Sequence, residues 1–315
     1  MDNYVETLKE GQKIDMNLLI TNSVKGVSNA GSPYLSITFQ DKTGSIDGKK
    51  WDANELDAVV AESGKVVRVV ADVIEYRGVH QLKVLQISEV DQTQVDFVRF
   101  CIACPVPQET LLQKLHNYIN GIKNEDCKTI LNHILNKYYD RFIVYPAASK
   151  NHHCCLSGLL YHTISMADIA MMISSYYQTI DKDVLLTGVI LHDVGKVMEL
   201  SGPIATKYTL EGRLLGHISI MVGEIRIAAK EENISGEIPL LLQHMILSHH
   251  GNKDFGSPIL PLTREAVVLH FVDDLDSKMN ILDKAYDDVE EGEFTQRIIA
   301  LDGRAFYKPK KNSFQ

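Results

Sequence analysis

The chain has 315 residues, which is long enough for two domains with separate hydrophobic cores. Its formal net charge of −9 excludes a globally basic nucleic-acid-binding protein but is compatible with a local basic groove. The 5 cysteines do not suggest a disulfide framework, and no apolar run approaches the ~20 residues of a membrane span. Because the N-terminus is also acidic and polar, we expect a cytoplasmic protein that makes no membrane contact.

Strand patterns separated by turn residues occupy residues 14–90. Apolar and polar side chains alternate from Tyr34 to Gln40, and a turn at 41–44 leads into a second strand that ends at Trp51. Further strands are expected at 14–24, 65–75 and 79–90, and a short helix at 54–61. Five strands with a helix after the third predict the five-stranded Greek-key barrel called the OB-fold.

Aromatic and basic side chains on this barrel are candidate nucleic-acid contacts. The pattern DxxGxIxxxxW, from Asp41 to Trp51, resembles the strand pair of anticodon-binding OB domains. The candidates for base stacking and phosphate contact are Tyr34, Trp51, Lys49, Lys50, Arg77 and Lys83. The alternative is that the aromatic residues, Phe39 among them, belong to the core and the lysines form a solvated face. The acidic balance of residues 1–95 favours that alternative.

Residues 96–148 are expected to form a helical linker. Pro105 and Pro107 interrupt the chain after a Cys101–Cys104 CxxC pair, and helical apolar spacing follows. The CxxC pair is single and lies outside any βαβ context, so we expect packing rather than zinc binding or redox chemistry.

Histidines and carboxylates gather in the C-terminal half. A buried apolar run ends at His192 and Asp193, and burying such a pair is costly unless a metal ion or a charge partner satisfies it. His162 shares a helix face with Met166 and Ile169, so it points inward. Imidazole and carboxylate together suit divalent ions such as Mn²⁺, Fe²⁺ or Zn²⁺. Further candidate side chains are His217, at the start of a helix, and His249 and His250, at the end of another. Asp273 is a candidate on a later helix, whose apolar face is expected to include Leu269, Val272 and Leu275.

The order His…His-Asp…His…His-His…Asp resembles the HD superfamily of metal-dependent phosphohydrolases, an all-α fold. The segments that carry the resemblance are 158–163, 192–196, 216–217, 249–251 and 272–276. The resemblance implies one metal ion held by His162, His192, Asp193 and Asp273, and a second held by Asp193, His217, His249 and His250. Asp274 is the alternative to Asp273. Two such ions, about 3.5–4 Å apart, can activate water and neutralise charge on a phosphoryl group. Lys196 would bind a phosphate oxygen or assist the leaving group, and His153 or His152 would orient substrate or donate a proton.

The full chain is similar to the YhaM-type bacterial 3′→5′ exoribonucleases, which join an OB domain to an HD domain. Segments 145–153, 199–203, 215–221, 278–280 and 305–310 carry this similarity. It implies an OB-fold domain at 1–95, a linker at 96–148, an HD domain at 149–290 and a tail at 291–315. The implied activity is removal of nucleoside monophosphates from the 3′ end of single-stranded RNA, with DNA as a second substrate. The implied cofactor is two Mn²⁺ ions, with Fe²⁺, Co²⁺, Mg²⁺ and Zn²⁺ as alternatives, and the chain is a candidate homo-oligomer.

Two other functions fit parts of the sequence. One is an HD-type phosphodiesterase for nucleotides or cyclic dinucleotides, which needs the same ligands but no strand-binding domain. The other is a single-strand-binding protein with an inactive HD domain, which the intact set of candidate ligands disfavours.

Overall fold

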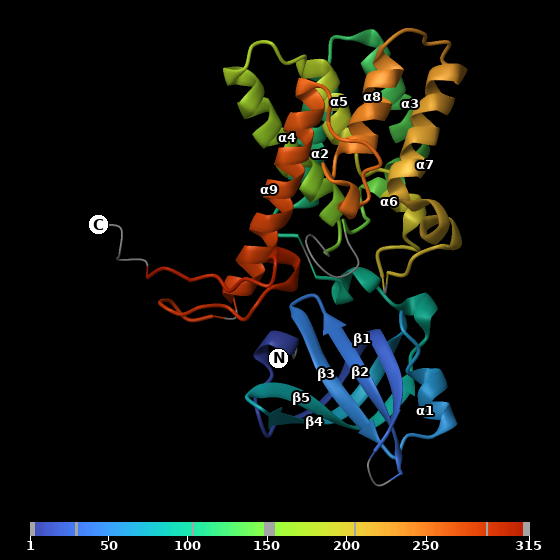
Figure 1. Ribbon diagram of the computed structural model, residues 1–315. Coiled ribbons are helices and arrows are strands. Elements are labelled where there is room, and N and C mark those ends of the chain that lie inside the picture. Colours follow the sequence, from blue (N-terminus) through green and yellow to red (C-terminus); the bar gives the residue numbers. More distant parts are fainter. Residues whose placement is uncertain are drawn as a thin grey trace. The chain divides into compact units, whose positions relative to one another are not determined.

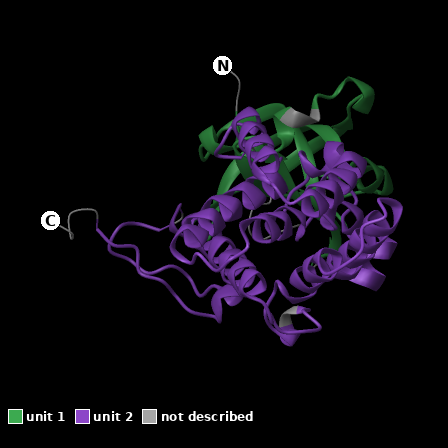
Figure 2. Cartoon of the chain, turned by 90° about the horizontal axis from the view of Figure 1, so that it is seen from above, with its two compact units in different colours: residues 1–103, 202–207 green, residues 104–201, 208–315 purple. Residues whose placement is uncertain are grey.

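The computed structural model describes residues 4–28, 31–102, 104–147, 155–204, 206–287 and 289–310. The chain divides into two compact units (Figure 2): unit 1 comprises residues 1–103 and 202–207, and unit 2 comprises residues 104–201 and 208–315. Each unit has its own cluster of buried apolar side chains. The described helices include none with the length and hydropathy that a membrane span requires.

Unit 1 is a closed five-stranded barrel (Figure 1). Its elements are β1 (Lys13–Val27), β2 (Pro33–Asp41), β3 (Gly44–Trp51), α1 (Glu55–Val60), β4 (Val66–Tyr76) and β5 (Val79–Glu89). The strand order is β1-β2-β3-β5-β4, and β4 pairs with β1 to close the barrel. Strands β3 and β5 are parallel, whereas the other neighbouring pairs are antiparallel. This order, with a helix after the third strand, is that of the OB-fold, so the predicted fold is confirmed.

The alternation predicted for β2 decides which side chains fill the barrel. Leu35, Ile37 and Phe39 are buried, whereas the residues between them lie on the outer side and are partly exposed. Phe39 is therefore a core residue. Trp51, for which a core position was the alternative, is 43% exposed.

In the described residues of unit 2, helices are joined by loops, and the β-pairing consists of isolated bridges between short segments. Its helices are α2 (Gln108–Gly121), α3 (Glu125–Phe142), α4 (Gly158–Tyr176), α5 (Lys182–Leu191), α6 (Lys196–Glu199), α7 (Leu210–Glu231), α8 (Ile238–Ser248) and α9 (Arg264–Asp287). Helix α5 is buried from Val184 to Leu191, and α3, α4, α8 and α9 pack against it. The all-α architecture expected for this half is confirmed. Helices α2 and α3, in the segment expected to be a linker, supply buried side chains to the same core.

Two helices differ from the sequence-based expectation. Helix α7 begins at Leu210 rather than at His217, and Gly216 interrupts it with φ 70° and ψ 154°. On α9, Leu275 was expected on the buried face, but it is exposed and Asp276 is buried instead. A buried carboxylate at that position needs polar partners, which the site described below supplies.

After α9 the chain forms a short two-stranded arm. Isolated bridges join Phe294 to Tyr307 and Ile298 to Arg304. The Nζ of Lys308 donates hydrogen bonds to the carbonyl oxygens of Tyr286 and Val289, which fastens the arm to the end of α9.

Candidate metal centre

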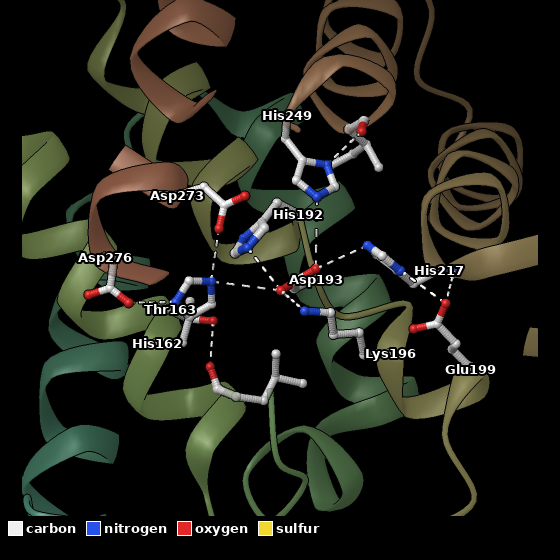
Figure 3. A network of polar contacts seen from close by, with 12 residues as sticks. His162, Thr163, His192, Asp193, Lys196, Glu199, His217, His249, Asp273 and Asp276 are labelled. Carbon is white, nitrogen blue, oxygen red and sulfur yellow. Dashed lines mark hydrogen bonds and ion pairs between the residues drawn. The ribbon is translucent and has the colours of Figure 1, made fainter. Parts of the chain in front are cut away.

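Five of the predicted ligands gather around a sixth, Asp193. His162 projects from α4, His192 and Asp193 follow the last turn of α5, and His217 lies just after the break in α7. His249 follows the end of α8, and Asp273 comes from the middle of α9 (Figure 3). The structure therefore brings together side chains that are more than 100 residues apart in the sequence.

The two carboxylate oxygens of Asp193 face different histidines. Its Oδ2 atom lies 3.2 Å from Nε2 of His192 and 3.8 Å from Nε2 of His162. Its Oδ1 atom lies 3.3 Å from Nε2 of His217 and 3.9 Å from Nε2 of His249. Asp193 thus stands between two sets of imidazole nitrogens, with one oxygen toward each set.

Two groups of described residues have donor atoms close enough together to hold a metal ion. One group is His162, His192 and Asp193, and the other is His217, His249 and His250. Within each group, the donor atoms all lie within 4.8 Å of one another. The ring centroids of His249 and His250 are 4.2 Å apart, and those of His217 and His250 are 5.5 Å apart.

Several of these donor atoms are buried without a hydrogen-bond partner. Among the described residues, this holds for Nε2 of His192, His217 and His249 and for Oδ1 of Asp193. Buried polar atoms in folded proteins nearly always have partners, and each exception calls for an explanation. A cation at these atoms would satisfy them, since lone pairs of imidazole and carboxylate are what a divalent ion accepts. The residues present therefore fit a metal centre.

Backbone carbonyl groups orient two of the imidazoles. Nδ1 of His192 lies 2.7 Å from the Val189 carbonyl oxygen, and Nδ1 of His249 lies 2.8 Å from that of Ile246. A carbonyl oxygen can only accept, so in the neutral ring the proton is assigned to Nδ1 and the lone pair to Nε2. Both histidines follow a helix end and bond to the carbonyl three residues earlier, so the same local turn positions both candidate ligands.

Carboxylates orient the other two imidazoles, and sequence analysis missed both. Asp276 Oδ2 accepts from Nδ1 of His162 at 2.7 Å, and the Ser165 hydroxyl donates to the other Asp276 oxygen. Glu199 Oε1 lies 3.2 Å from Nδ1 of His217 and accepts the His217 backbone N–H at 3.1 Å. Partners of this kind fix the ring orientation and raise the basicity of a metal ligand. A helical spacing of three residues, from Asp273 to Asp276 and from Lys196 to Glu199, is the signal that could have identified them.

Charges around Asp193 keep it ionised although it is buried. Burial disfavours the carboxylate and the Lys196 ammonium favours it, and the pKa of Asp193 is held well below its usual range. The Nζ atom of Lys196 lies 2.6 Å from Asp193 Oδ2. Burial opposes the charge of Lys196 too, but the neighbouring carboxylates raise its pKa, so Lys196 stays a cation.

The imidazoles of His249 and His162 differ in their affinity for protons. Burial and the neighbouring histidines lower the pKa of His249 well below its usual value, which keeps the ring neutral. His162 is also opposed by burial, but its bonds to Asp273 and Asp276 raise its pKa to about 9. Nε2 of His162, 3.2 Å from Asp273 Oδ1, is the atom at which a proton and a metal ion would compete.

The structure separates the two aspartates that were alternatives on α9. Asp273 faces His162, whereas Asp274 Oδ2 lies 2.7 Å from Nζ of Lys278 in an ion pair on the helix surface. The geometry thus favours Asp273 as the residue of the centre. His152 and His153 lie outside the described residues.

A close backbone contact fixes the position of His217. A Cβ atom at Gly195 would lie 2.4 Å from the His217 carbonyl oxygen, so only glycine lets the start of α6 approach α7 this closely. The break at Gly216, where φ is 70°, then leaves the His217 backbone N–H directed at Glu199. The distance between Asp193 and His217 therefore depends on two glycines.

On the barrel, three of the six predicted nucleic-acid contacts lie together. Tyr34 and Trp51 are register partners on β2 and β3, with ring centroids 5.1 Å apart. The Lys49 ammonium lies 5.2 Å from the centroid of the Tyr34 ring and 5.4 Å from that of the Trp51 ring. The Tyr34 ring lies over Gly26, where a Cβ atom would come within 2.5 Å of the ring. These residues form an aromatic and basic patch on the outer face of the barrel.

The other three predicted contacts have different surroundings. Lys50 turns toward α1, where its Nζ atom lies 3.8 Å from an Asp57 oxygen. Lys83 is exposed on β5 and lies beside this patch, because it is the register partner of Lys49. Arg77 lies in the β4–β5 turn, stacked on Tyr76. The parallel pairing of β3 with β5 puts that turn near the start of β3, whereas Trp51 ends β3. Arg77 therefore lies near the opposite end of β3 from Trp51, and its contact with nucleic acid stays a prediction.

Comparison with known protein families bears on the helical unit. Residues 159–278 match the family model of the HD domain. An HD domain implies a metal-dependent phosphohydrolase, and the matched range contains every residue of the centre described above. The assignment of individual histidines and aspartates as metal ligands stays a prediction.

A solved structure matches the barrel. It is the solution NMR structure of the second OB-fold domain of replication protein A from Methanococcus maripaludis, at 21% sequence identity. The match covers 29% of this chain and 97% of that chain, with a TM-score of 0.25. The fold assignment for unit 1 rests instead on its strand order.

Proposed function

We propose that this chain is a metal-dependent 3′→5′ exonuclease that hydrolyses phosphodiester bonds of single-stranded RNA, and also of DNA, and releases nucleoside monophosphates. The observation that carries the proposal is the position of Asp193, with one carboxylate oxygen toward each of two sets of buried imidazole nitrogens. The direction of digestion rests on the resemblance to the YhaM-type exoribonucleases.

The proposal includes two divalent ions, with Mn²⁺ as the expected metal. His162, His192, Asp193 and Asp273 would hold one ion, and Asp193, His217, His249 and His250 the other. When bound, such a pair of ions activates water and neutralises the negative charge that builds on a phosphoryl group. This supply of positive charge is what a chain with net charge −9 needs in order to accept a phosphodiester.

Lys196 has a separate role in the proposal. Its ammonium lies beside Asp193 and keeps its proton, because the surrounding carboxylates raise its pKa. It therefore suits the binding of a phosphate oxygen, by charge and hydrogen bond, rather than the removal of a proton from water.

The barrel would bind the strand. Tyr34 and Trp51 offer two ring faces for bases, and Lys49 supplies a cation at the same place. Stacking of a base on an aromatic side chain is worth roughly 1–3 kcal/mol and tolerates any sequence. Such a patch suits an enzyme that removes nucleotides one after another without regard to sequence.

The test is digestion of 5′-labelled single-stranded RNA by the purified full chain with Mn²⁺. We expect a ladder of labelled products that shorten from the 3′ end, and no ladder when a chelator removes the metal. Asp193→Asn keeps the side-chain volume but removes the charge, so activity should fall by at least about 100-fold. Asp274→Asn, on the surface of α9, is the matched control and should leave the ladder unchanged.

The rival functions give different results in the same assay. Hydrolysis of a cyclic dinucleotide without degradation of RNA would replace the proposal by a small-nucleotide phosphodiesterase. Binding of RNA without cleavage, whichever divalent metal is supplied, would indicate an inactive HD domain. A ladder that shortens from the 5′ end would contradict the proposed direction.

A further inference from the structure

The peptide unit that links His249 to His250 has both of its polar groups bound by side chains from other segments. Its carbonyl oxygen, that of His249, lies 3.0 Å from Nδ1 of His270 on α9. Its N–H, that of His250, donates to the Ser257 hydroxyl at 3.0 Å. Because His249 and His250 belong to the same group of candidate ligands, these two bonds fix the backbone between two neighbouring ligands.

The His270 ring also packs on the turn that follows the two histidines. A Cβ atom at Gly251 would lie 2.2 Å from one atom of this ring and 2.3 Å from two others, so the ring rests on the Gly251 backbone. A carbonyl oxygen can only accept, so Nδ1 of His270 is the donor. Nε2 of His270 is among the ring atoms against Gly251, and His270 belongs to neither group of described candidate ligands. His270 therefore supports the turn and is not directed at an ion.

One side of α9 contacts both groups of candidate ligands. His270, Asp273 and Asp276 follow one another at intervals of three residues, so successive members are neighbours on the helix surface. Asp273 and Asp276 face the two nitrogens of His162, which belongs to the first group. His270 bonds to His249, which belongs to the second group. The same helix can therefore set the positions of ligands on both sides of the centre.

We propose that His270 is a positioning residue for the ion that His217, His249 and His250 would hold. Together with Ser257 it clamps the peptide between His249 and His250, and rotation of that peptide would turn one imidazole away from the other. Binding sites need their ligands held within about 0.5 Å of the productive geometry by supporting contacts of this kind. The inference rests on the proposed metal centre and concerns the binding of the ion, not the identity of the substrate.

The first experiment titrates the metal-free full chain with Mn²⁺ in a calorimeter, which measures the affinity for each ion. His270→Phe keeps a ring on Gly251 but removes the donor, so the affinity for one of the two ions should fall by about 10–100-fold and that for the other should not change. His270→Asn offers a side-chain NH₂ as donor and should retain most of the affinity. His116→Phe, where the ring stacks on Tyr139 away from the centre, is the matched control and should change neither affinity.

The second experiment removes the other half of the clamp. Ser257→Ala should weaken the same ion as His270→Phe, because the two side chains bind the same peptide unit. The double variant should weaken that ion by less than the product of the two single effects, since residues that act through a shared element are not additive. Thermal melts of every variant check that the chain is folded.

Several results would overturn the role of His270. They are an unchanged Mn²⁺ affinity in His270→Phe, an equal loss for both ions, an equal loss in His270→Asn, and a double variant whose effect equals the product of the single ones. A wild-type chain that binds fewer than two ions would overturn the two-ion centre and this proposal with it. A chain that binds two ions but leaves RNA intact would contradict the proposed exonuclease and leave the role of His270 standing.

Discussion

At the scale of single residues, the metal centre depends on which nitrogen of each imidazole carries the proton. In His192 and His249, a hydrogen bond to a backbone carbonyl oxygen fixes the protonated nitrogen, and substitution of a side chain cannot remove that carbonyl. In His162 and His217, the carboxylates of Asp276 and Glu199 fix it, and each of these side chains can be substituted separately. Mutagenesis can therefore test the carboxylate partners but not the backbone carbonyl partners.

Asp276→Asn is expected to weaken metal binding without unfolding the protein. The amide NH₂ of asparagine can donate to Nδ1 of His162, which would move the ring proton to Nε2, the atom that should bind the ion. Loss of such an orienting partner typically costs about 10–100-fold in metal affinity. Titration of the metal-free protein with Mn²⁺ measures the change, and Asp274→Asn serves as the control. Equal affinity for wild type and Asp276→Asn would show that Asp276 has no orienting role.

At the scale of elements, the centre depends on how closely α6 approaches α7. Gly195, at the start of α6, faces the backbone of His217 rather than a side chain that could rotate away. Any added atom at this position must separate the two helices, and so must separate Asp193 from His217.

Gly195→Ala is therefore expected to lower phosphodiesterase activity by about 100-fold, as a displacement of about 1 Å in an active site can. Gly223→Ala is the control, since it lies within α7 with no atom within 4 Å of its added Cβ. Alanine at that position should raise the melting temperature, because it favours a helix interior by about 1 kcal/mol over glycine. Activity measurements and thermal melts of both variants check this. Full activity in Gly195→Ala would mean that the helices can separate without cost to the site.

At the scale of the whole molecule, the two units have separate cores and separate expected tasks. If the barrel binds the strand and the HD domain cleaves it, a change on the barrel should alter the affinity for RNA and leave the cleavage chemistry intact.

Trp51→Ala tests this division. Loss of one stacking ring, worth roughly 1–3 kcal/mol, should raise KM for single-stranded RNA by about 5–150-fold. The kcat for a small chromogenic phosphodiester, which cannot reach a strand-binding surface, should not change. Leu56→Ala, at an exposed apolar residue on α1, should alter neither quantity. A fall in kcat for the small diester would show instead that Trp51 supports the folded state.

The sequence by itself determined the elements and the candidate ligands. Alternation in β2 and the apolar run before His192 are local patterns, and local patterns decide whether a segment is a strand or a buried helix. The order of histidines and aspartates along the chain likewise identified five candidate ligands that lie around a sixth, Asp193.

Only the tertiary structure decided how those residues are used. It turned Lys50 toward Asp57, put Arg77 at the far end of β3 from Trp51, and exposed Leu275 while burying Asp276. It also supplied Glu199 and Asp276 as partners of His217 and His162. The physical reason is that spacing along a helix or strand fixes only the direction of a side chain, whereas its partner is fixed by which other element packs against that face.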